Sequence, residues 1–430
     1  MISRDTSLLR RKLSVCSTIT ICLRGGPAAQ RRLSHGFLSN VRVSVAHRLG
    51  NSAVFSRPVG VGGGLPAPTQ ATERTPPAFT SVFMPEFPPR TFPREDKFQI
   101  QGLVAKGSFG PILKVKDICK EKTYAVKVLP KSEILKHGVL EQSKEEVIIQ
   151  RQLCHPFIHN LQDCWQTQRH LFIMSEYCST GDLYTYWIMK GQFAEDEVRL
   201  FAAELGSALG FLHDLGIMHR DIKLENILLS DQGHLRLSDF GLSCRLKRGG
   251  RAFTICGTIQ YMGETPEILS GGPYSHAADW WSLGVVLFSL VSGKFPVPAE
   301  PDHCSMLKKV RDFSYVVPNT FSSALALLLT ELLCKNPANR LRNLECFKMQ
   351  PFFRGTSFDP YILQKTPVKF ILELRTHPDW ADKSKRGPSL DELDNFDCDQ
   401  ILHSPTTPSD LSPTLTDVSL SSCAEQTCKA

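Results

Sequence analysis

The residues from His219 to Gly241 constrain the possible folds of this chain more than any other stretch. His219–Asn226 reads His-Arg-Asp-Ile-Lys-Leu-Glu-Asn, and an Asp-Phe-Gly triplet stands at Asp239–Gly241. Two short apolar runs, at residues 227–229 and 235–237, separate the two motifs. The acid, lysine and amide of the first motif can face one small volume only from an extended loop, and the apolar runs fit short strands. The sequence therefore predicts two loops, joined by strands, whose polar groups converge.

Two carboxylates and one amide, from Asp221, Asn226 and Asp239, would meet where these loops converge. Mg²⁺ prefers oxygen ligands and keeps several waters, so this set suits a hard cation that carries phosphate. A turn with solvated charges is the alternative for the first motif taken alone. The Asp-Phe-Gly triplet at this distance favours the metal site.

A glycine-containing turn, Lys106–Gly110, joins two strand-like runs. Glycine has no Cβ, so backbone N–H groups there can approach a polyphosphate closely. A Gly-x-x-Gly pattern alone is more often a simple hairpin turn. The next strand-like run, residues 124–128, carries Lys127, and burying an unpaired charge in an apolar strand is costly. Lys127 fits there if it meets nucleotide phosphates and the carboxylate of Glu146, which lies on an amphipathic stretch.

Three further segments complete the expected framework. An apolar run at residues 171–174 leads into a linker, Glu176–Cys178, whose backbone groups could bond an adenine. Residues 195–213 repeat apolar side chains at helical spacing, which predicts a helix that packs on the core. Asp279 begins a strongly apolar helix, and an acid there usually caps the first turn.

Composition separates a folded centre from two arms. The 430-residue chain has a net charge of +7, yet residues 1–72 hold ten Lys or Arg against one acid. The basicity therefore belongs to this arm and says little about what the folded part binds. We expect residues 1–97, rich in Arg, Ser, Pro and Gly, to be disordered, and residues 354–430 to be largely so. The arm also fits a mitochondrial transit peptide, or a segment attracted to anionic membrane or nucleic acid.

The cysteines and the hydropathy favour a chain that works inside the cell. Its 14 cysteines form neither a C-x-x-C pair nor a zinc-spaced cluster, so we expect reduced thiols. No apolar run reaches the roughly eighteen residues that a transmembrane helix needs. We expect a cytoplasmic location, with a mitochondrial or membrane-associated one through the N-terminal arm as the alternative.

Residues 98–353 resemble the AGC group of Ser/Thr protein kinases from end to end. Three motifs point to this group: Thr-x-Cys-Gly-Thr at 254–258, Asp-Trp-Trp-Ser-Leu-Gly at 279–284 and Asn-Pro-Ala-Asn-Arg-Leu at 336–341. Within it, the chain is most similar to the ribosomal S-six kinases and their divergent, RSK-like related branch. The resemblance implies an α+β, bilobal fold: a small lobe of antiparallel strands with one key helix, a larger, mainly helical lobe, and ATP in the cleft between them.

The resemblance also implies roles for individual residues. Asp221 would accept the proton of the substrate hydroxyl, and Lys223 would steady the transferred phosphate. Asn226 and Asp239 would bind Mg²⁺. Lys127 would hold the α- and β-phosphates. The residues expected around the nucleotide are Val104, Ala105, Lys106, Gly107, Ser108, Phe109, Gly110, Ile112, Ala125, Lys127, Glu146, Glu176, Cys178, Asp182 and Leu228.

Two acids and one threonine would connect the site to its protein partners. Asp182 and Glu225 stand where related kinases hold arginines of the substrate, which predicts basic target sequences. Thr254 stands where the group carries its activating phosphate, and Arg220, with Arg248 or Arg251 as further partners, could pair with that phosphate. A loop threonine without this role is the alternative. An upstream activating kinase and protein substrates are therefore the expected partners.

Two departures from the group's pattern affect the loops around the cleft. Ala105 replaces the first glycine of the usual Gly-x-Gly-x-x-Gly turn. Pro111 directly follows Gly110, the last glycine of the turn. Both would stiffen the lid, and Ala105 would add strain if that position requires a positive φ. The usual Ala-Pro-Glu appears as Gly-Glu-Thr-Pro-Glu at residues 263–267, with two extra residues. Glu267 can still pair with Arg340, although the segment before it could be displaced.

Two further departures concern Gln150 and the C-terminal tail. Gln150 stands where an apolar residue normally stacks with neighbours such as Phe240, and a polar group there must find a partner or lose stability. The C-terminal tail has no clear Phe-x-x-Phe-Ser/Thr-Tyr motif to dock back on the small lobe. Control of the enzyme could therefore differ from that of its relatives.

The first expectation is an active, monomeric Ser/Thr protein kinase that uses ATP and Mg²⁺. The rival is an inactive scaffold of the same fold that acts through protein interactions. A scaffold typically lacks one of the five groups that the chemistry requires, and all five are present: Lys127, Glu146, Asp221, Asn226 and Asp239. Nucleic-acid binding rests on the basic arm alone and is not favoured.

Overall fold

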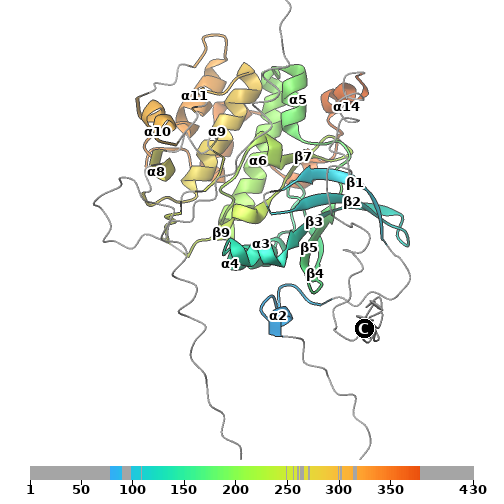
Figure 1. The fold of residues 1–430 in the computed structure, drawn as a ribbon. Coiled ribbons are helices and arrows are strands. Elements are labelled where there is room, and N and C mark those ends of the chain that lie inside the picture. The colour runs from blue at the N-terminus through green and yellow to red at the C-terminus, as the bar shows by residue number, and fades with distance from the viewer. Residues whose placement is uncertain are drawn as a thin grey trace, which may run out of the picture. The chain divides into compact units, whose positions relative to one another are not determined.

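The structure, a computed structural model, describes most of the chain between residues 78 and 377 (Figure 1). The described residues are 78–89, 98–107, 109–247, 249–254, 256–258, 261, 266–269, 272–298, 300, 303–312 and 317–377. All of them belong to one compact unit. The basic N-terminal stretch, Ser108, the Gly-Glu-Thr insertion at 263–265 and the Ser/Thr-Pro tail lie outside them, together with the expectations placed on them.

The small lobe is built around one antiparallel sheet with the strand order β1-β2-β3-β5-β4. Its strands are β1 (Phe98–Lys106), β2 (Pro111–Asp117), β3 (Lys122–Pro130), β4 (Leu161–Gln166) and β5 (His170–Glu176). Two helices connect β3 to β4: α3 (Lys131–Lys136) and α4 (Leu140–Gln150). This arrangement confirms the small lobe expected from the sequence.

Alternation along β3 separates the core face of the sheet from its other face. Tyr124, Val126 and Val128 are buried and pack together in one apolar cluster of the lobe, and Leu129 is buried in a second cluster. The alternate side chains of the strand, Thr123, Ala125 and Lys127, are only partly buried. Successive side chains of a strand point to opposite faces, so Lys127 lies outside the apolar core of its own sheet.

The large lobe is mainly helical, as expected. Its helices are α5 (Leu183–Lys190), α6 (Glu195–Asp214), α8 (Pro266–Leu269), α9 (Ala277–Ser292), α10 (His303–Asp312), α11 (Ser323–Leu332) and α12 (Leu344–Lys348), followed by the 3₁₀ turn η3 (Pro351–Phe353). Helix α9 packs against α6 and α11, and Figure 1 shows α6 and α9 at the centre of this lobe. The apolar stripe predicted for residues 195–213 is buried in α6, which confirms its role in packing.

Two small two-stranded sheets accompany the large sheet. Strand β7 (Ile227–Leu229) pairs antiparallel with β8 (Leu235–Leu237), so the two apolar runs form the predicted strands. The 3₁₀ turns η1 (Leu224–Asn226) and η2 (Phe240–Leu242) flank this hairpin. Strand β6 (Ile217–Met218) pairs with β9 (Cys244–Arg245) and brings the chain after η2 back beside the loop before η1.

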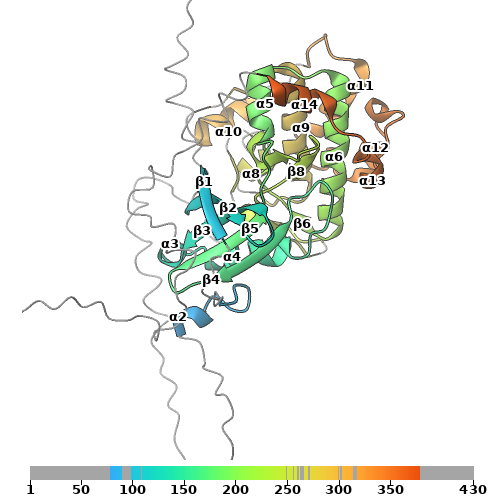
Figure 2. The same ribbon diagram turned by 90° about the vertical axis from the view of Figure 1, so that its right-hand side faces the viewer.

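Two stretches that we assigned to the disordered arm and the tail are folded. Residues 78–89, which begin with α2 (Ala78–Ser81), place Phe83 and Phe87 in the small lobe with no exposed surface. Residues 354–377 carry α13 (Pro360–Leu363) and α14 (Lys369–Thr376), and Ile371 of α14 is buried in the core of the large lobe (Figure 2). Apolar side chains at these few positions outweigh the polar composition around them.

Within the described part of the chain, no helix has the length and apolar character needed to cross a membrane. The eight cysteines whose side chains the structure describes are free thiols, and only Cys164 and Cys256 among these eight are buried. Both findings concern these residues alone.

Candidate active site

The loop formed by residues 219–226 is anchored by α9. Asp279 lies in the first turn of α9 and is 1% exposed. Its Oδ2 accepts the N–H of His219 and its Oδ1 accepts the N–H of Arg220, both at 2.9 Å. Our expectation that Asp279 caps its own helix is therefore wrong. The cap position is His276, and the carboxylate bonds the loop because that is where two buried N–H groups need an acceptor.

This anchoring holds the loop in a conformation that is costly by itself. Arg220 has a φ of 68°, in the left-handed region that a residue with a Cβ rarely adopts. Its side chain donates to the carbonyl of Leu242 at 2.6 Å and to Tyr274 Oη at 3.3 Å. Burial alone would raise the pKa of the Asp279 carboxyl, but the bond from His213 and its charge hold that pKa below its ordinary value. The anchor therefore stays ionised.

The loop brings Asp221, Lys223 and Asn226 together, as the sequence predicted. Lys223 Nζ lies 2.8 Å from Asp221 Oδ2. Asn226 Nδ2 donates to the same oxygen at 3.0 Å and to the Asp221 carbonyl at 2.9 Å. Thr258 Oγ1 donates to Asp221 Oδ1 at 2.9 Å and lies 2.8 Å from Lys223 Nζ. Both carboxylate oxygens of Asp221 are therefore fixed in direction.

A second cluster joins the small lobe to the Asp-Phe-Gly triplet. Lys127 Nζ lies 2.8 Å from Glu146 Oε1 on α4 and 3.8 Å from Asp239 Oδ1. Burial alone would lower the pKa of Lys127, yet the two carboxylates outweigh it and raise that pKa well above its ordinary value. Burial likewise acts to raise the pKa of Asp239, and the charges of Lys127 and Lys223 hold it below its ordinary value. Ionised carboxylate and ammonium groups therefore face one another across the two lobes.

Helix α4 also bonds directly to the turn that follows Asp239. Gln142 Nε2 donates to the carbonyl of Gly241. Asp239 has a φ of 60°, and its carboxylate accepts the N–H of Gly241 at 3.3 Å. The rings of Phe240 and His219 meet edge to face with centroids 4.9 Å apart. The helix, the triplet and the loop at 219–226 are thus mechanically connected.

The donor set near Asp239 fits a divalent cation. Asn226 uses its amide nitrogen on Asp221, which leaves the amide oxygen as its ligand atom. Ser238 donates to the Asn226 carbonyl through both its N–H and its Oγ at 2.8 Å, which fixes Asp239 next to Asn226. The Asp239 side chain is 49% exposed, so it can meet an ion from the cleft. One carboxylate and one amide oxygen with room for waters suit Mg²⁺.

Apolar side chains from both lobes border the place expected for an adenine. Ala125 of β3 lies opposite Ser175 of β5 in the sheet register, and Leu228 of β7 forms a bridge with the backbone of Asp182. Ala125 and Leu228 are partly exposed, as are Val104 and Ile112. The linker carbonyl of Glu176 lies 2.7 Å from His159 Nε2. A carbonyl oxygen has two lone pairs, so this contact leaves one for a ligand.

The glycine turn lies close to the sheet. The N–H of Gly107 donates to the carbonyl of Gly110 at 2.9 Å, and a Cβ on Gly110 would lie 2.0 Å from the Val128 carbonyl oxygen. Only glycine fits at that position. Ala105 pairs with Ile112 and is not among the described residues with a positive φ, so the strain that we expected there is absent. Pro111 causes no conflict because it is the first residue of β2.

Comparison with known proteins agrees with this geometry. The protein kinase domain family matches residues 98–353. The chain belongs to the protein kinase family. It is 54% identical to the human ribosomal protein S6 kinase-related protein over 339 residues, which cover 78% of this chain and 80% of that protein. A putative serine/threonine-protein kinase of Caenorhabditis elegans is 41% identical over 298 residues, and a RAC family serine/threonine-protein kinase homolog of Dictyostelium discoideum is 34% identical over 285 residues.

These relatives identify the kinase as an AGC-type Ser/Thr protein kinase close to the RSK-like branch, as the sequence motifs indicated. The alignments cover 68% of this chain and 66% of the nematode protein, and 66% of this chain and 63% of the Dictyostelium protein. Protein kinase domains use ATP and a divalent metal ion, so both belong to the family's chemistry.

The two acids that we expected near substrate arginines have different surroundings in this kinase. Asp182 is the N-cap of α5: its Oδ1 accepts the N–H of Thr185 at 2.8 Å. Oε2 of Glu225 is buried and has no hydrogen-bond partner among the described residues. Burial is the main reason that the pKa of Glu225 lies above its ordinary value. An unpaired carboxylate oxygen in the loop at 219–226 is costly unless a cation meets it.

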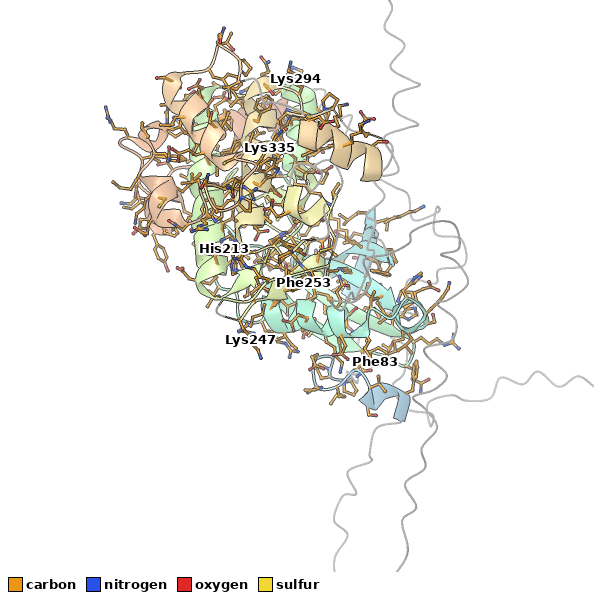
Figure 3. All side chains as sticks on the ribbon, turned by 90° about the vertical axis from the view of Figure 1, so that its left-hand side faces the viewer. Phe83, His213, Lys247, Phe253, Lys294 and Lys335 are labelled. Carbon is orange, nitrogen blue, oxygen red and sulfur yellow. The ribbon has the colours of Figure 1, made fainter. Side chains whose placement is uncertain are left out.

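The activation segment of the kinase is described only in part. The carbonyl of Thr254 accepts a bond from Tyr274 Oη at 2.6 Å, and Arg220 donates to the same Oη at 3.3 Å. Thr254 therefore lies one side chain away from the residue expected to bind its phosphate. Phe253, beside it, is 57% exposed (Figure 3). Arg248, an alternative partner, lies outside the described residues.

The end of this segment is fixed despite its two extra residues. Arg340 pairs with Glu267 through two contacts, Nη1–Oε1 at 2.6 Å and Nη2–Oε2 at 3.1 Å. The guanidinium is fully buried and lies 4.7 Å from the ring centroid of Trp281. The pairing that the sequence predicted is therefore present.

Gln150, at the end of α4, has no good partner. It is 7% exposed, and its Oε1 is buried without a hydrogen bond among the described residues. Helix α4 packs on η2, which begins with Phe240. The structure therefore shows no partner for this oxygen in the part of the chain that it describes, and the loss of stability expected from its sequence position stays a prediction.

Three residues of the site escaped the sequence analysis. Thr258 fixes Asp221, His159 contacts the linker carbonyl, and Asp279 anchors the loop instead of capping its helix. Thr258 closes the Thr-x-Cys-Gly-Thr motif, so its position could have suggested a role. No local pattern marks His159, because its contact is formed by packing between β4 and β5.

Proposed function

We propose that this kinase is catalytically active and transfers the γ-phosphate of ATP to serine or threonine hydroxyls of proteins. The observation that supports activity over a scaffold is the intact Lys127–Glu146 pair at 2.8 Å, combined with an Asp221 whose two carboxylate oxygens are both directed by neighbours. Phosphoryl transfer needs mainly positioning and charge neutralisation. An inactive scaffold has no need of either arrangement.

In the proposed step, the substrate hydroxyl oxygen attacks the γ-phosphorus in line with the leaving group. Its proton passes to Asp221 as the new O–P bond forms, and the bond between the γ-phosphorus and the bridging oxygen breaks to release ADP. Lys223 forms an ion pair with Asp221 Oδ2 and would neutralise charge on the transferred phosphoryl group. Thr258 would keep Oδ1 directed, so the base does not rotate away from the hydroxyl.

Asn226 and Asp239 would hold Mg²⁺, which supplies charge neutralisation on the β- and γ-phosphates when bound. Lys127 would contact the α- and β-phosphates while Glu146 fixes its direction. The glycine turn would approach the phosphates with backbone N–H groups. Ala125 and Leu228 would enclose the adenine from the two lobes.

We further propose basic target sequences and control by phosphorylation. The unpaired Oε2 of Glu225 supports an arginine of the substrate as its partner. The position of Arg220 next to Tyr274, which bonds Thr254, supports a phosphate on Thr254 as the activating modification. That modification requires an upstream kinase or autophosphorylation.

The test is turnover of Mg-ATP by the full-length protein with an arginine-containing peptide. Asp221→Asn keeps the shape of the side chain but removes the base, and we expect phosphate incorporation to fall by at least about 10²-fold. Asp196→Asn, an exposed acid in the first turn of α6, is the matched control and should leave the rate unchanged. Equal, background-level incorporation by the wild type and Asp221→Asn would favour the scaffold.

A further inference from the structure

A short segment before the kinase domain is packed into the small lobe. We call residues 78–89 the docking segment. Phe83 and Phe87 have no exposed surface. The apolar side chains around them come from β3, α3, α4, β4 and β5, and they are Leu129, Ile134, Val139, Val147, Cys164, Leu171 and Ile173. Figures 1 and 2 both show α2 beside β4, and Figure 3 places Phe83 at the outer end of the small lobe.

The backbone of the docking segment satisfies a buried amide of the domain. Gln166, at the end of β4, has no exposed surface. Its Nε2 donates to the carbonyls of Thr80 and Phe87. Its own N–H donates to the carbonyl of Pro88 at 3.0 Å, and Pro89 pairs with it in a parallel bridge. Without the segment, these donors would lose their partners, so the domain depends on the backbone carbonyls that the segment supplies.

A lysine is enclosed by the same segment. Lys131, at the start of α3, is 1% exposed and donates from Nζ to Gln166 Oε1 at 2.6 Å. Its Nζ lies 4.6 Å from the ring centroid of Phe83 and 5.2 Å from that of Phe79. Burial lowers the pKa of Lys131 to about 8. The ammonium group of Lys131 therefore contacts two aromatic rings and one amide oxygen instead of water.

The segment bonds the outer side of α4. Lys144 Nζ lies 3.3 Å from Glu86 Oε2 and donates to the Met84 carbonyl. Arg151, which caps α4, donates to the Glu86 carbonyl at 2.8 Å. Val147, between these two residues, lies in the apolar cluster of the segment. Residues three and four apart share one face of a helix, so this side of α4 belongs to the docking segment.

The inner side of α4 carries the groups that meet the cleft. Glu146 pairs with Lys127, and Gln142 bonds the Gly241 carbonyl. Gln150, on the same side, has a buried oxygen without a partner among the described residues. Helix α4 therefore has an unpaired polar atom on the side that faces the cleft, whereas the side that faces the docking segment is well bonded.

From this arrangement we propose that the docking segment is a positioning element of the kinase, supplied by its own N-terminal arm. It fills the groove between α3, α4 and β4 and holds α4 so that Glu146 meets Lys127. The C-terminal tail has no clear motif that could fill this groove from the other end of the chain. Release of the segment would let α4 move and would open the groove to a competing peptide. The inference rests on the proposed catalytic function.

The test uses full-length protein with Phe83→Ala and Phe87→Ala combined. We expect kcat to fall by about 10²-fold, because a displaced positioning group costs roughly that much. A synthetic peptide of residues 76–92, added in excess, should restore most of the rate. Val82→Ala, in the same segment but 45% exposed, is the control and should behave as the wild type. Unchanged kcat in the folded double variant would overturn the proposal.

Hydrogen exchange separates this proposal from the function on which it rests. In an Asp221→Asn background, which cannot turn over, the two Phe substitutions should still increase amide exchange in α4 and leave α6 and α9 protected. Equal protection of α4 in both proteins would overturn the docking role even if the kinase proves active. Loss of protection throughout the protein would mean that the double Phe variant is unfolded. In that case the salt bridge between Glu86 and Lys144 supplies a second test of the docking role. Glu86→Lys and Lys144→Glu should each lower kcat, and the combination should recover it; no recovery would contradict the proposal.

Discussion

The catalytic loop at 219–226 and helix α4 are held in opposite ways. The loop is bonded from the core of the large lobe: Asp279 takes two of its N–H groups, and Asp221 receives three polar side chains. Helix α4 rests on a partly exposed ion pair, an inner side with an unpaired Gln150 oxygen, and a segment from outside the kinase domain. The difference indicates that Asp221, the proposed base, is held by the core of the large lobe, whereas the position of Lys127, the proposed phosphate contact, depends on a helix with fewer such bonds. Control of activity is therefore expected at α4.

Removing the loop's anchor should have the largest effect. In Asp279→Asn, one of the two loop N–H groups meets an amide nitrogen instead of an acceptor. We expect a loss of about 3 kcal/mol in the free energy of unfolding, because a buried donor to a charged partner is left unsatisfied. Chemical denaturation and kcat measure both consequences. Asp196→Asn, an acid in the corresponding turn of α6, should change neither. An Asp279→Asn protein as stable and active as that control would show that the loop does not depend on its anchor.

The proposed phosphate on Thr254 would link the loop at 219–226 to an upstream kinase. In Thr254→Ala the proposed phosphate cannot form, and Arg220 keeps only its bonds to Leu242 and Tyr274. Each charge-assisted bond of a phosphate contributes about 1–3 kcal/mol, so we expect activity to fall by roughly 10- to 100-fold. Phosphate transfer is measured before and after phosphatase treatment. Thr330→Ala, at an exposed position of α11, is the control. Phosphatase treatment that leaves the wild-type rate unchanged would exclude this role for Thr254.

Substrate choice tests the buried Oε2 of Glu225, which has no hydrogen-bond partner among the described residues. Glu225→Gln should reduce the preference for an arginine peptide over the matched alanine peptide by about tenfold in kcat/KM, because a partly buried charge pair is lost. Asp182→Asn should weaken the cap of α5 and lower stability by roughly 1 kcal/mol, with little effect on that preference. The reverse result would mean that Asp182 meets the substrate, as the sequence alone allowed.

The inner side of α4 can be repaired by one substitution. Gln150→Leu replaces a buried oxygen that lacks a partner with an apolar side chain, so we expect a gain of about 1 kcal/mol in stability. It should also reduce the damage caused by Phe83→Ala with Phe87→Ala, since α4 would then be held better from within. Thermal melting and kcat of the combined variants measure this coupling. Gln162→Leu, at an exposed position of β4, is the control. A loss of stability in Gln150→Leu would indicate that the amide has a role in this packing.

The sequence predicted those parts that depend on local pattern and fixed spacing. Two short apolar runs were enough to predict the β7–β8 hairpin, and the spacing of the motifs predicted that Asp221, Lys223 and Asn226 converge. Alternation in β3 predicted a lysine that the sheet could not bury alone. In each case, chain neighbours determine the direction of the side chain.

The parts that the sequence did not predict depend on contacts between distant segments. Asp279 was expected to cap its helix, because no local signal shows that two N–H groups of another loop lie within its reach. The docking segment was assigned to the disordered arm because it lies among Pro-rich residues, although its own stretch has no Lys or Arg and carries Phe79, Phe83 and Phe87. The burial of Phe83 and Phe87 depends on a groove formed by five elements, which no sequence window contains. From the sequence, Asp182 and Glu225 likewise had the same expected role, because their different surroundings depend on contacts with distant segments.

The smallest predicted effect is a pH dependence of docking at Lys131. Burial lowers the pKa of this lysine to about 8 in the docked form, and we expect that pKa to rise toward 10.5 when the segment leaves. Below about pH 8 the lysine is charged in both states and docking bears the full cost of burying that charge. As the pH rises through the pKa of the docked form, the docked form loses its proton first, so docking should strengthen by about tenfold between roughly pH 7 and pH 9.

Binding of the labelled 76–92 peptide to the Phe83→Ala, Phe87→Ala protein, followed by anisotropy, measures this change. Lys131→Met should remove the pH dependence, because no proton is then released. The same slope in both proteins would assign the effect to another group and leave Lys131 as an ordinary packed side chain.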